Sequence, residues 1–400
     1  MITLNLKFLD SKNWIFLSMN KLIIIFILFF YTTADVFANP AIKARTVILL
    51  DYHSNEVLYD VEADAAIYPA SMTKIMTAIV AFDLIKKNKL SLDDKFTISE
   101  NAWRLSQAGY SSMFIMINDQ VSVENLLKGI IIASGNDACV ALAEGIAGSE
   151  ENFAQMMNEK ATEIGLISTN FTNASGINDP DNISTVRDIA LMSKYLIQNY
   201  PDFYELFGEK TFTWDRTGGE PIKQGNRNPL LYKNIGVDGV KTGYLAVEKY
   251  SLASSMKKND RRLIAVASGF ETKNLRSSES LKLLNWGFRN TNTFEISKVK
   301  KTSFKIDTWL GKKNEIAVTT EEDYYITINK KDIRHLSVIL NYSGPVKAPI
   351  QKGDKIAELI IKKKDEILKT LPLFASEDLK KVNFFKSLAT SLNYLIWGDV

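Results

Sequence analysis

The sequence predicts an α+β protein: a domain in which helices accompany a largely antiparallel sheet, then a small all-β domain, then an amphipathic helix at the C-terminus. Residues 39–290 mix helical periodicity with strand-like runs, whereas residues 291–374 hold only short strand-like segments separated by turn residues and lysines. Residues 375–400 return to a helical period. These changes of pattern divide the chain, after a leader at residues 1–38, into three parts.

The first domain begins with residues 46–50 and 56–59, which are typical of a β-hairpin. Apolar residues at helical spacing predict its helices, and Ser184 is a suitable N-cap for one of them. The expected helices are residues 71–85, 122–127, 137–146, 153–164, 184–199 and 278–288, and the further strands are residues 237–242, 250–255 and 263–268.

The second domain is typical of a small β-sandwich or barrel. Its expected strands are residues 303–309, 315–318, 324–328, 336–341 and 355–361. It contains no cluster of catalytic side chains, which favours a spacer or a binding module.

The C-terminal segment predicts an amphipathic helix that Ser376 could cap. Lysines lie off its apolar stripe, and such a helix can lie in a membrane interface with its lysines near anionic headgroups. The alternative is a helix that packs its stripe on the β domain. The stripe consists of Leu379, Val382, Phe385, Leu388, Leu392 and Ile396, and the lysines are Lys380, Lys381 and Lys386.

The N-terminus has the pattern of a secretory signal peptide. Lys21 precedes an apolar run at residues 22–30, and compact Val36 and Ala38 stand before a cleavage point after Ala38. The run is short for a membrane span, which needs about 20 residues. We therefore expect residues 1–38 to be removed and the mature chain to be exported to the periplasmic face of the cytoplasmic membrane; an uncleaved anchor is the alternative. Met19 is an alternative start.

The composition excludes several classes of function. Lys and Arg number 49 against 46 Asp and Glu, a net charge of +3, which gives no support for nucleic-acid binding. A single cysteine, Cys139, rules out an internal disulfide. Two histidines make a zinc hydrolase implausible and a Ser-His-Asp triad improbable, so a hydrolase of this sequence would use a base other than histidine.

Ser71-Met72-Thr73-Lys74 is the first motif with chemistry. On a helix, positions i and i+3 face the same way, which places the Lys74 amine beside the Ser71 hydroxyl. A desolvated lysine with a lowered pKa can act as the base that a serine nucleophile needs. At a helix N-terminus, free backbone N–H groups can stabilise an oxyanion.

Two further motifs follow the first in order along the chain. In Ser134-Gly135-Asn136, the serine can relay a proton to a leaving amine, and the asparagine can hold the Lys74 amine or a substrate amide. In Lys241-Thr242-Gly243, the cation and hydroxyl can bind a carboxylate, and the glycine leaves room for substrate backbone beside an edge strand. Each motif is weak alone, but the ordered trio is strong.

With this trio, the chain resembles the serine D-Ala-D-Ala carboxypeptidases, the low-molecular-mass penicillin-binding proteins, in which Ser-Gly-Asn is the usual second motif. The resemblance extends to the β domain and the terminal helix, so it covers nearly all of the mature chain. Four segments carry it: residues 67–78 (IYPASMTKIMTA), 128–144 (KGIIIASGNDACVALAE), 226–231 (NRNPLL) and 276–288 (RSSESLKLLNWGF).

The resemblance implies a β-lactamase/transpeptidase-like fold and an acyl-enzyme mechanism without metal or cofactor. Ser71, deprotonated by Lys74, would attack the peptide bond between the two terminal D-alanines of a peptidoglycan stem peptide, and Ser134 would help to protonate the leaving amine. The backbone N–H groups of Ser71 and Tyr244 would bind the oxyanion. The substrate carboxylate would be held by Lys241, Thr242 and Arg276, and a β-lactam would acylate Ser71 as a substrate mimic. Arg227 is expected to be structural.

One segment departs from the family pattern. After Lys-Thr-Gly, the family usually has a threonine and later an Ala-Gly pair, whereas this chain has Leu245, Glu248 and Lys249 at those places. The change adds bulk and charge beside the substrate strand and bears on substrate preference and rate. Alternatively, Glu248 and Lys249 are a solvated turn.

Three other functions are alternatives to the carboxypeptidase. A DD-endopeptidase or transpeptidase could use the same site, although the appended domain and helix favour the carboxypeptidase. A β-lactamase commonly needs a Glu-x-x-Leu-Asn segment, which is absent between Ser134 and Lys241. A non-catalytic cell-wall scaffold is opposed by the intact trio.

Overall fold

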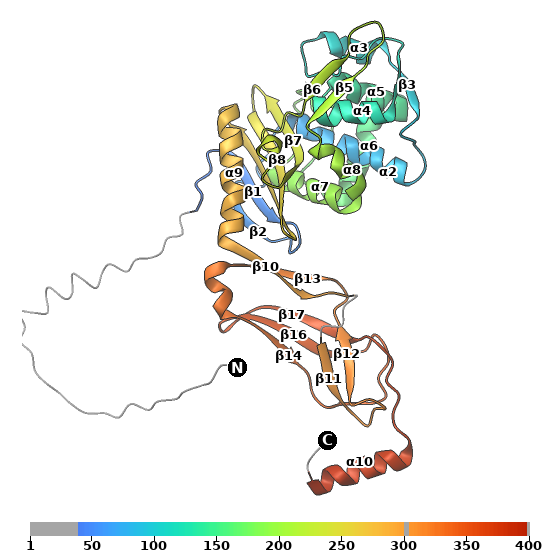
Figure 1. Ribbon diagram of the computed structural model, residues 1–400, viewed down its shortest axis with the longest axis vertical. Helices are drawn as coiled ribbons and strands as arrows, with labels where there is room; N and C mark the ends of the chain where they lie inside the picture. Colours follow the sequence, from blue (N-terminus) through green and yellow to red (C-terminus); the bar gives the residue numbers. More distant parts are fainter. Residues whose placement is uncertain (1–38, 300–303, 398–400) are drawn as a thin grey trace, which may run out of the picture. The chain divides into compact units, whose positions relative to one another are not determined.

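The computed structural model describes residues 39–299 and 304–397. The predicted signal peptide lies outside these residues. The first domain is built on a five-stranded sheet whose order is β2-β1-β9-β8-β7, and every neighbouring pair in it is antiparallel (Figure 1). Its strands are β1 (Thr46–Asp51), β2 (Val57–Val61), β7 (Val237–Leu245), β8 (Lys249–Lys258) and β9 (Arg261–Phe270). The Lys-Thr-Gly motif therefore lies on an edge strand, β7.

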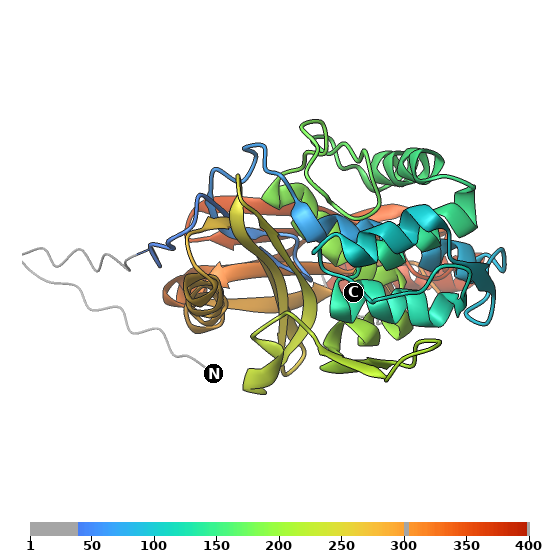
Figure 2. The same cartoon turned by 90° about the horizontal axis from the view of Figure 1, so that it is seen from above.

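The alternation of side chains along each strand supplies both faces of the sheet with apolar groups. On β1, Val47 and Leu49 pack with Leu283 of α9 (Lys273–Asn290). Ile48 and Leu50 of the same strand belong to the larger core shared with the other helices of the domain. Figure 2 shows the sheet between α9 and those helices.

The helical part carries the first two motifs. Its helices are α2 (Lys74–Lys86), α3 (Glu100–Gln107), α4 (Val123–Lys128), α5 (Asn136–Ala147), α6 (Glu150–Ile164), α7 (Val186–Asn199) and α8 (Pro201–Tyr204), and its short hairpins pair β3 (Lys95–Thr97) with β4 (Gln120–Ser122) and β5 (Thr211–Trp214) with β6 (Ile222–Gly225). The N-cap of α7 is Thr185, whose side chain accepts from the Asp188 N–H; the prediction of Ser184 is wrong, because Ser184 pairs with Ile67 through backbone hydrogen bonds.

The second domain has two β layers. A six-stranded sheet has the order β14-β16-β17-β12-β11-β15, and β10 pairs separately with β13. Ile326 of β13 joins Leu359 and Leu373 of the larger sheet in one core. The strands are β10 (Thr291–Ser297), β11 (Phe304–Trp309), β12 (Glu315–Thr319), β13 (Tyr324–Asn329), β14 (Leu336–Asn341), β15 (Val346–Lys347), β16 (Lys355–Lys363) and β17 (Glu366–Ala375).

The terminal helix α10 (Phe384–Trp397) is shorter than the expected segment. Ser376 does not cap it: the Asn383 side chain accepts from the Lys386 N–H at 2.9 Å. Leu379 is not part of an exposed stripe either, because it pairs with Ile350 and is buried in the β-domain core. The residues from Phe385 onward do form an exposed apolar stripe, since Phe385, Leu388 and Leu392 are exposed.

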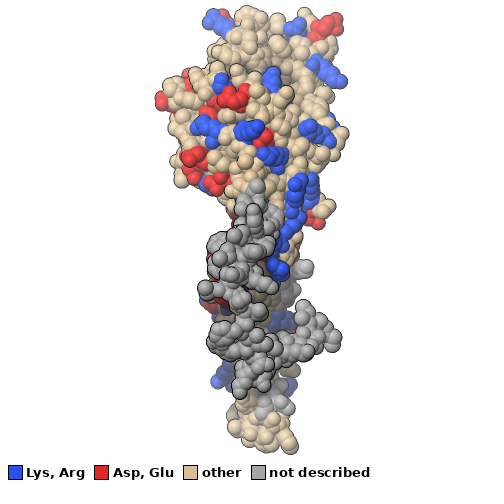
Figure 3. Space-filling view, turned by 90° about the vertical axis from the view of Figure 1, so that its left-hand side faces the viewer, with Lys and Arg blue, Asp and Glu red and all other residues tan. Residues whose placement is uncertain are grey.

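Charged side chains of both signs are interspersed on the face of the molecule in Figure 3. This distribution agrees with the near balance of charge in the sequence.

Candidate active site

Ser71 lies in the short 3-10 helix η1 (Ala70–Thr73), which runs directly into α2. The chain enters through Pro69, whose carbonyl accepts from the Met72 N–H. Ala70 has a φ of 50°, which is unfavourable for a residue with a side chain. Gly176 packs so closely on the Ala70 carbonyl that a Cβ at position 176 would collide with it. Tight packing therefore holds the nucleophile segment in its unusual conformation, and Ser71 itself is half-buried.

Lys74 is fully buried, and its amine has three partners. Its Nζ lies 2.6 Å from Asn136 Oδ1, 2.5 Å from the Ser175 carbonyl oxygen and 3.1 Å from Ser71 Oγ. The first two partners are acceptors only, so they take two N–H groups. In the neutral amine, the lone pair then faces the Ser71 hydroxyl and can accept its proton.

Burial lowers the pKa of Lys74, with the neighbouring Arg227 as a further cause. The interior disfavours a charged amine, so the neutral form is populated at lower pH than for an exposed lysine. Burial raises the pKa of the Cys139 thiol to about 12, and this buried cysteine remains protonated. Lys74 is thus the group suited to act as base.

A sharp change of backbone conformation between two helical segments positions Ser134 and Asn136. The π-helical turn η2 (Gly129–Ala133) ends at Ser134, which adopts left-handed dihedrals of 62° and 34°, and α5 begins at Asn136. Gly135 is required between them, because a Cβ there would lie 2.7 Å from Asp137 Oδ1. Asn136 reaches Lys74 directly; among the described residues, the Ser134 hydroxyl makes no hydrogen bond.

Asp137 is a buried residue that the sequence analysis missed. Its carboxylate accepts from the Ser112 hydroxyl at 2.5 Å and from the backbone N–H groups of Met113 and Phe114 at 2.8 Å each. It therefore anchors the loop before β4 to the first turn of α5, beside the Ser-Gly-Asn motif. One sign of this role is present in the sequence, where an acidic residue directly follows the Ser-Gly-Asn motif.

The Lys-Thr-Gly motif lies on β7 with its side chains turned into the protein. Lys241 and Thr242 are buried, whereas Tyr244 is 53% exposed. A Cβ on Gly243 would lie 3.0 Å from the Pro69 carbonyl oxygen, so β7 passes directly beside the nucleophile segment. Burial and then the neighbouring Lys74 hold the pKa of Lys241 well below its usual range. A bound carboxylate would supply the counter-charge that Lys241 needs.

Arg276 of α9 adds a further cation near the motif. Its guanidinium lies 5.7 Å from the centre of the Tyr250 ring, and Tyr250 in turn lies 4.5 Å from Tyr244, ring centre to ring centre. Arg276 is buried and its Nε has no hydrogen-bond partner among the described residues. Burial lowers the pKa of Arg276. Such an unpaired cation is suited to binding an anion.

Arg227 contacts the backbone directly before the second motif. Its Nε donates to the Ala133 carbonyl at 3.1 Å, immediately before Ser134. The adjacent Asn228 donates to the Gly239 carbonyl at 2.9 Å. This segment therefore connects the second motif to β7.

The interpretation of Glu248 as part of a solvated turn is wrong. Its side chain is only 5% exposed and forms an ion pair with Arg45 at 2.6 Å. Lys249 is exposed, with a φ of 65°, so the solvated description fits Lys249 alone. The glutamate is buried because the turn folds back against the ends of β1 and β9.

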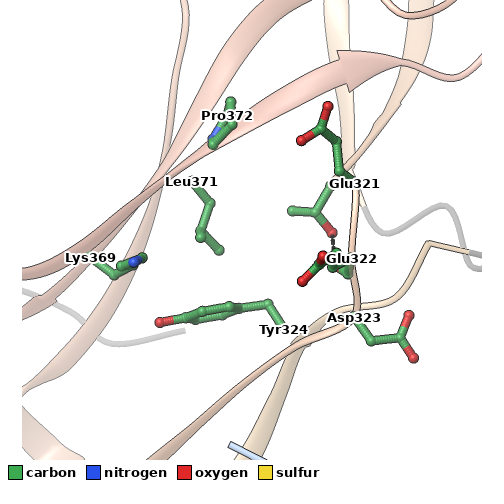
Figure 4. Close-up of a pocket in the computed structure, with 8 residues that line it drawn as sticks. Glu321, Glu322, Asp323, Tyr324, Lys369, Leu371 and Pro372 are labelled. Carbon is green, nitrogen blue, oxygen red and sulfur yellow. Dashed lines mark hydrogen bonds between the residues drawn. The ribbon is translucent and has the colours of Figure 1, made fainter. Parts of the chain in front are cut away.

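A hollow of about 260 Å³ lies in the β domain, away from all of these side chains. Figure 4 shows Leu371 above the Tyr324 ring and the Asp323 carboxylate directed away. The side chains that line this hollow offer no paired nucleophile and base. Its lining consists of Thr320, Glu321, Glu322, Asp323, Tyr324, Lys369, Leu371 and Pro372.

A serine hydroxyl facing a buried lysine amine, beside an edge strand with further buried cations, defines a serine–lysine acyl-transfer site. Comparison with known proteins agrees. The sequence model of the D-alanyl-D-alanine carboxypeptidase family matches residues 33–272, and that of the penicillin-binding protein 5 C-terminal domain matches residues 292–381. The D-alanyl-D-alanine carboxypeptidase DacC of Escherichia coli (strain K12) is 39% identical over 351 residues, which cover 86% of each chain.

Solved structures give the same relationship. Penicillin-binding protein 5 from Haemophilus influenzae superposes with a TM-score of 0.77 and 36% identity, covering 86% of this chain and 99% of that one. The ampicillin-bound penicillin-binding protein D2 from Listeria monocytogenes has a TM-score of 0.56 and 27% identity over 63% of this chain and all of its own (100%).

The chain belongs to the D-alanyl-D-alanine carboxypeptidase family. This membership confirms the predicted serine peptidase and its carboxypeptidase activity. It also confirms the predicted fold, in which a penicillin-binding domain precedes an all-β domain and a C-terminal helix.

Proposed function

We propose that this carboxypeptidase removes the terminal D-alanine from peptidoglycan stem pentapeptides through an acyl-enzyme on Ser71. The observation that supports this most strongly is the Lys74 amine, which is buried, 3.1 Å from Ser71 Oγ, and held by two carbonyl oxygens. Lys74 accepts the hydroxyl proton as Ser71 Oγ attacks the carbonyl carbon. The backbone N–H groups of Ser71 and Tyr244 stabilise the resulting oxyanion.

The tetrahedral intermediate then collapses. The C–N bond breaks, and the proton held by Lys74 passes through Ser134 to the departing D-alanine amine. Water hydrolyses the ester on Ser71 and restores the hydroxyl. Asn136 keeps the amine of Lys74 aligned throughout, since it accepts one of its N–H groups.

Recognition of the terminal carboxylate is the task of the cations around β7. Lys241 and Arg276 are both buried, and burial lowers the pKa of each, so a carboxylate between them relieves the unfavourable environment of both charges. Thr242 contributes a hydroxyl, and Gly243 leaves space for the substrate backbone. A free carboxylate is the feature that separates a carboxypeptidase substrate from an internal peptide bond.

A β-lactam is expected to acylate the same serine. Its strained amide replaces the D-Ala-D-Ala bond, and its carboxylate occupies the place of the terminal one. Incubation with penicillin should add one penicilloyl group per chain, and tryptic mass spectrometry should locate it on the peptide that contains Ser71. An adduct on Ser134 or on any other residue would contradict the proposed nucleophile.

We further propose that the protein is exported and acts at the periplasmic face of the cytoplasmic membrane. Residues 1–38 have the pattern of a secretory signal peptide, which directs a protein out of the cytoplasm. In the described part of the chain, no helix has the length and hydrophobicity of a membrane span. We propose that attachment is peripheral, through the terminal helix.

The helix α10 is the proposed membrane anchor. At 1.5 Å per residue its 14 residues extend about 21 Å, which suits a helix lying in the interface. Phe385, Leu388 and Leu392 are exposed on one side, and Lys386 lies off that stripe. Lys380 and Lys381 precede the helix and can approach anionic headgroups.

This anchor predicts how substitutions change binding to vesicles that contain anionic lipid. A Phe385→Asp/Leu392→Asp variant should lose binding by at least about tenfold in cosedimentation, because two apolar side chains leave the interface. A Ser387→Asp/Thr390→Asp variant adds the same charge on the opposite side and should retain more binding than the first variant. Equal binding by the two variants would contradict the orientation of the helix.

A further inference from the structure

Glu248 is a carboxylate that takes no part in the proposed reaction of Ser71. It lies in the turn between β7 and β8, and its side chain is 5% exposed. One carboxylate oxygen accepts from the Arg45 guanidinium at 2.6 Å and from the Ser268 hydroxyl at 2.8 Å. The other accepts from the backbone N–H of Tyr68 at 3.3 Å. Both oxygens of this carboxylate are thus engaged.

Glu248 connects two segments that carry active-site motifs, because it lies after the Lys-Thr-Gly motif and accepts from Tyr68. Tyr68 lies three residues before Ser71, in the segment that leads into η1. Glu248 itself follows the Lys-Thr-Gly motif on the same hairpin, and its N–H donates to the Leu245 carbonyl at 3.1 Å. One buried side chain therefore joins the hairpin that presents the substrate strand to the segment that presents the nucleophile.

The nucleophile segment depends on such tethers because its own conformation is strained. Ala70 has a positive φ, and packing must hold it in place. The preceding residues are fixed at three points: Arg45 donates to the Ala66 carbonyl at 3.2 Å, Ile67 pairs with Ser184, and Tyr68 donates to Glu248. Arg45 and Glu248 thus act as one pair across residues 66–68.

We propose that Glu248 is a positioning residue that sets the placement of Ser71 relative to β7, so that acylation requires its carboxylate. The inference rests on Ser71 being the nucleophile. It gives a role to the glutamate that stands where the resemblance predicts a small residue. Glutamine has the same size as glutamate but offers one acceptor oxygen, so it cannot serve Arg45 and the Tyr68 N–H together.

The test is stopped-flow acylation by a fluorescent penicillin, with active-site titration of each preparation. The limiting acylation rate constant per titrated site should fall about tenfold in Glu248→Gln and about 10²-fold in Glu248→Ala, because small displacements of reacting groups have large effects on rate. The deacylation rate constant should fall as well, because attack of water on the ester needs the same placement of Ser71 relative to the Tyr244 N–H group. Glu100→Ala removes a glutamate that pairs with Arg104 but is 61% exposed, and it should match the wild type.

The outcomes distinguish loss of fold from failure of the proposal for Glu248 and from failure of the assignment of Ser71. Loss of fold alone would lower the titrated amplitude and leave the rate constant per site unchanged, which would overturn the proposal. Wild-type acylation rates in both Glu248 variants would overturn it too. If Glu248→Ala does not fold, the isosteric Glu248→Gln decides the question alone. Absence of labelling in the wild-type protein would instead contradict the proposed function on which the inference rests.

Discussion

Replacing Ser71 with alanine should abolish both D-alanine release and penicillin labelling. The acyl-enzyme cannot form without the hydroxyl, and loss of a nucleophile of this kind lowers kcat by at least about 10⁴-fold. The remaining contacts would be retained, because the alanine removes only one oxygen at a half-buried position. The measurements are D-alanine release from a stem pentapeptide and fluorescence of the protein after incubation with a labelled penicillin.

The matched control for this substitution is Ser278→Ala. Ser278 is exposed on α9, and its hydroxyl makes a local hydrogen bond of 3.4 Å to the Leu275 carbonyl. This variant should keep wild-type activity and labelling. Stoichiometric labelling of the Ser71→Ala protein would show that another residue is the nucleophile.

Replacing Lys74 should give the second largest loss and should also change the dependence on pH. In the wild type, burial lowers the pKa of Lys74, so the fraction of neutral amine increases as the pH rises through that lowered value. Acylation should therefore rise with pH in the same range. Lys74→Met should reduce acylation by about 10³-fold, within the range expected for loss of a general base, and should remove this rise.

The Lys74→Arg variant tests whether Lys74 acts through its basicity or only through its positive charge. Arginine keeps a positive charge but does not release its proton at ordinary pH, so it cannot act as the base. The arginine variant should be about as inactive as the methionine variant, and its acylation rate should not follow the wild-type pH profile. An arginine variant with near wild-type acylation would mean that the charge of Lys74, rather than its basicity, matters.

The local parts of the site could be predicted from the sequence, because they depend on spacing within one helix. Ser71 and Lys74 are three positions apart, and the structure places their polar atoms 3.1 Å apart. Asn136 and Lys241 come from distant segments, and the ordered trio of motifs together with the resemblance to a known family identified them. It could not reveal that the Ser175 carbonyl completes the environment of Lys74, since a backbone carbonyl leaves no signal in the residue type.

The missed features involve tertiary contacts that override local pattern. The sequence analysis did not predict β17, which contains Pro372 and the charged Glu366 and Lys369, all unfavourable in strands, yet this strand pairs along its length with β16. The terminal helix begins later than expected because the β-domain core buries Leu379. Glu248 was misread for the same reason: its charge favours an exposed turn until Arg45, Ser268 and Tyr68 are brought around it.

Release of D-alanine is the most direct test of the proposed reaction. Purified protein from residue 39 to residue 400 would be incubated with a stem pentapeptide that ends in D-Ala-D-Ala, beside the Ser71→Ala variant and a penicillin-treated sample. We predict that the untreated wild-type protein alone releases D-alanine and leaves the tetrapeptide. Release that persists in the Ser71→Ala variant, or no release and no penicillin labelling by the wild type, would contradict an acyl-enzyme on Ser71.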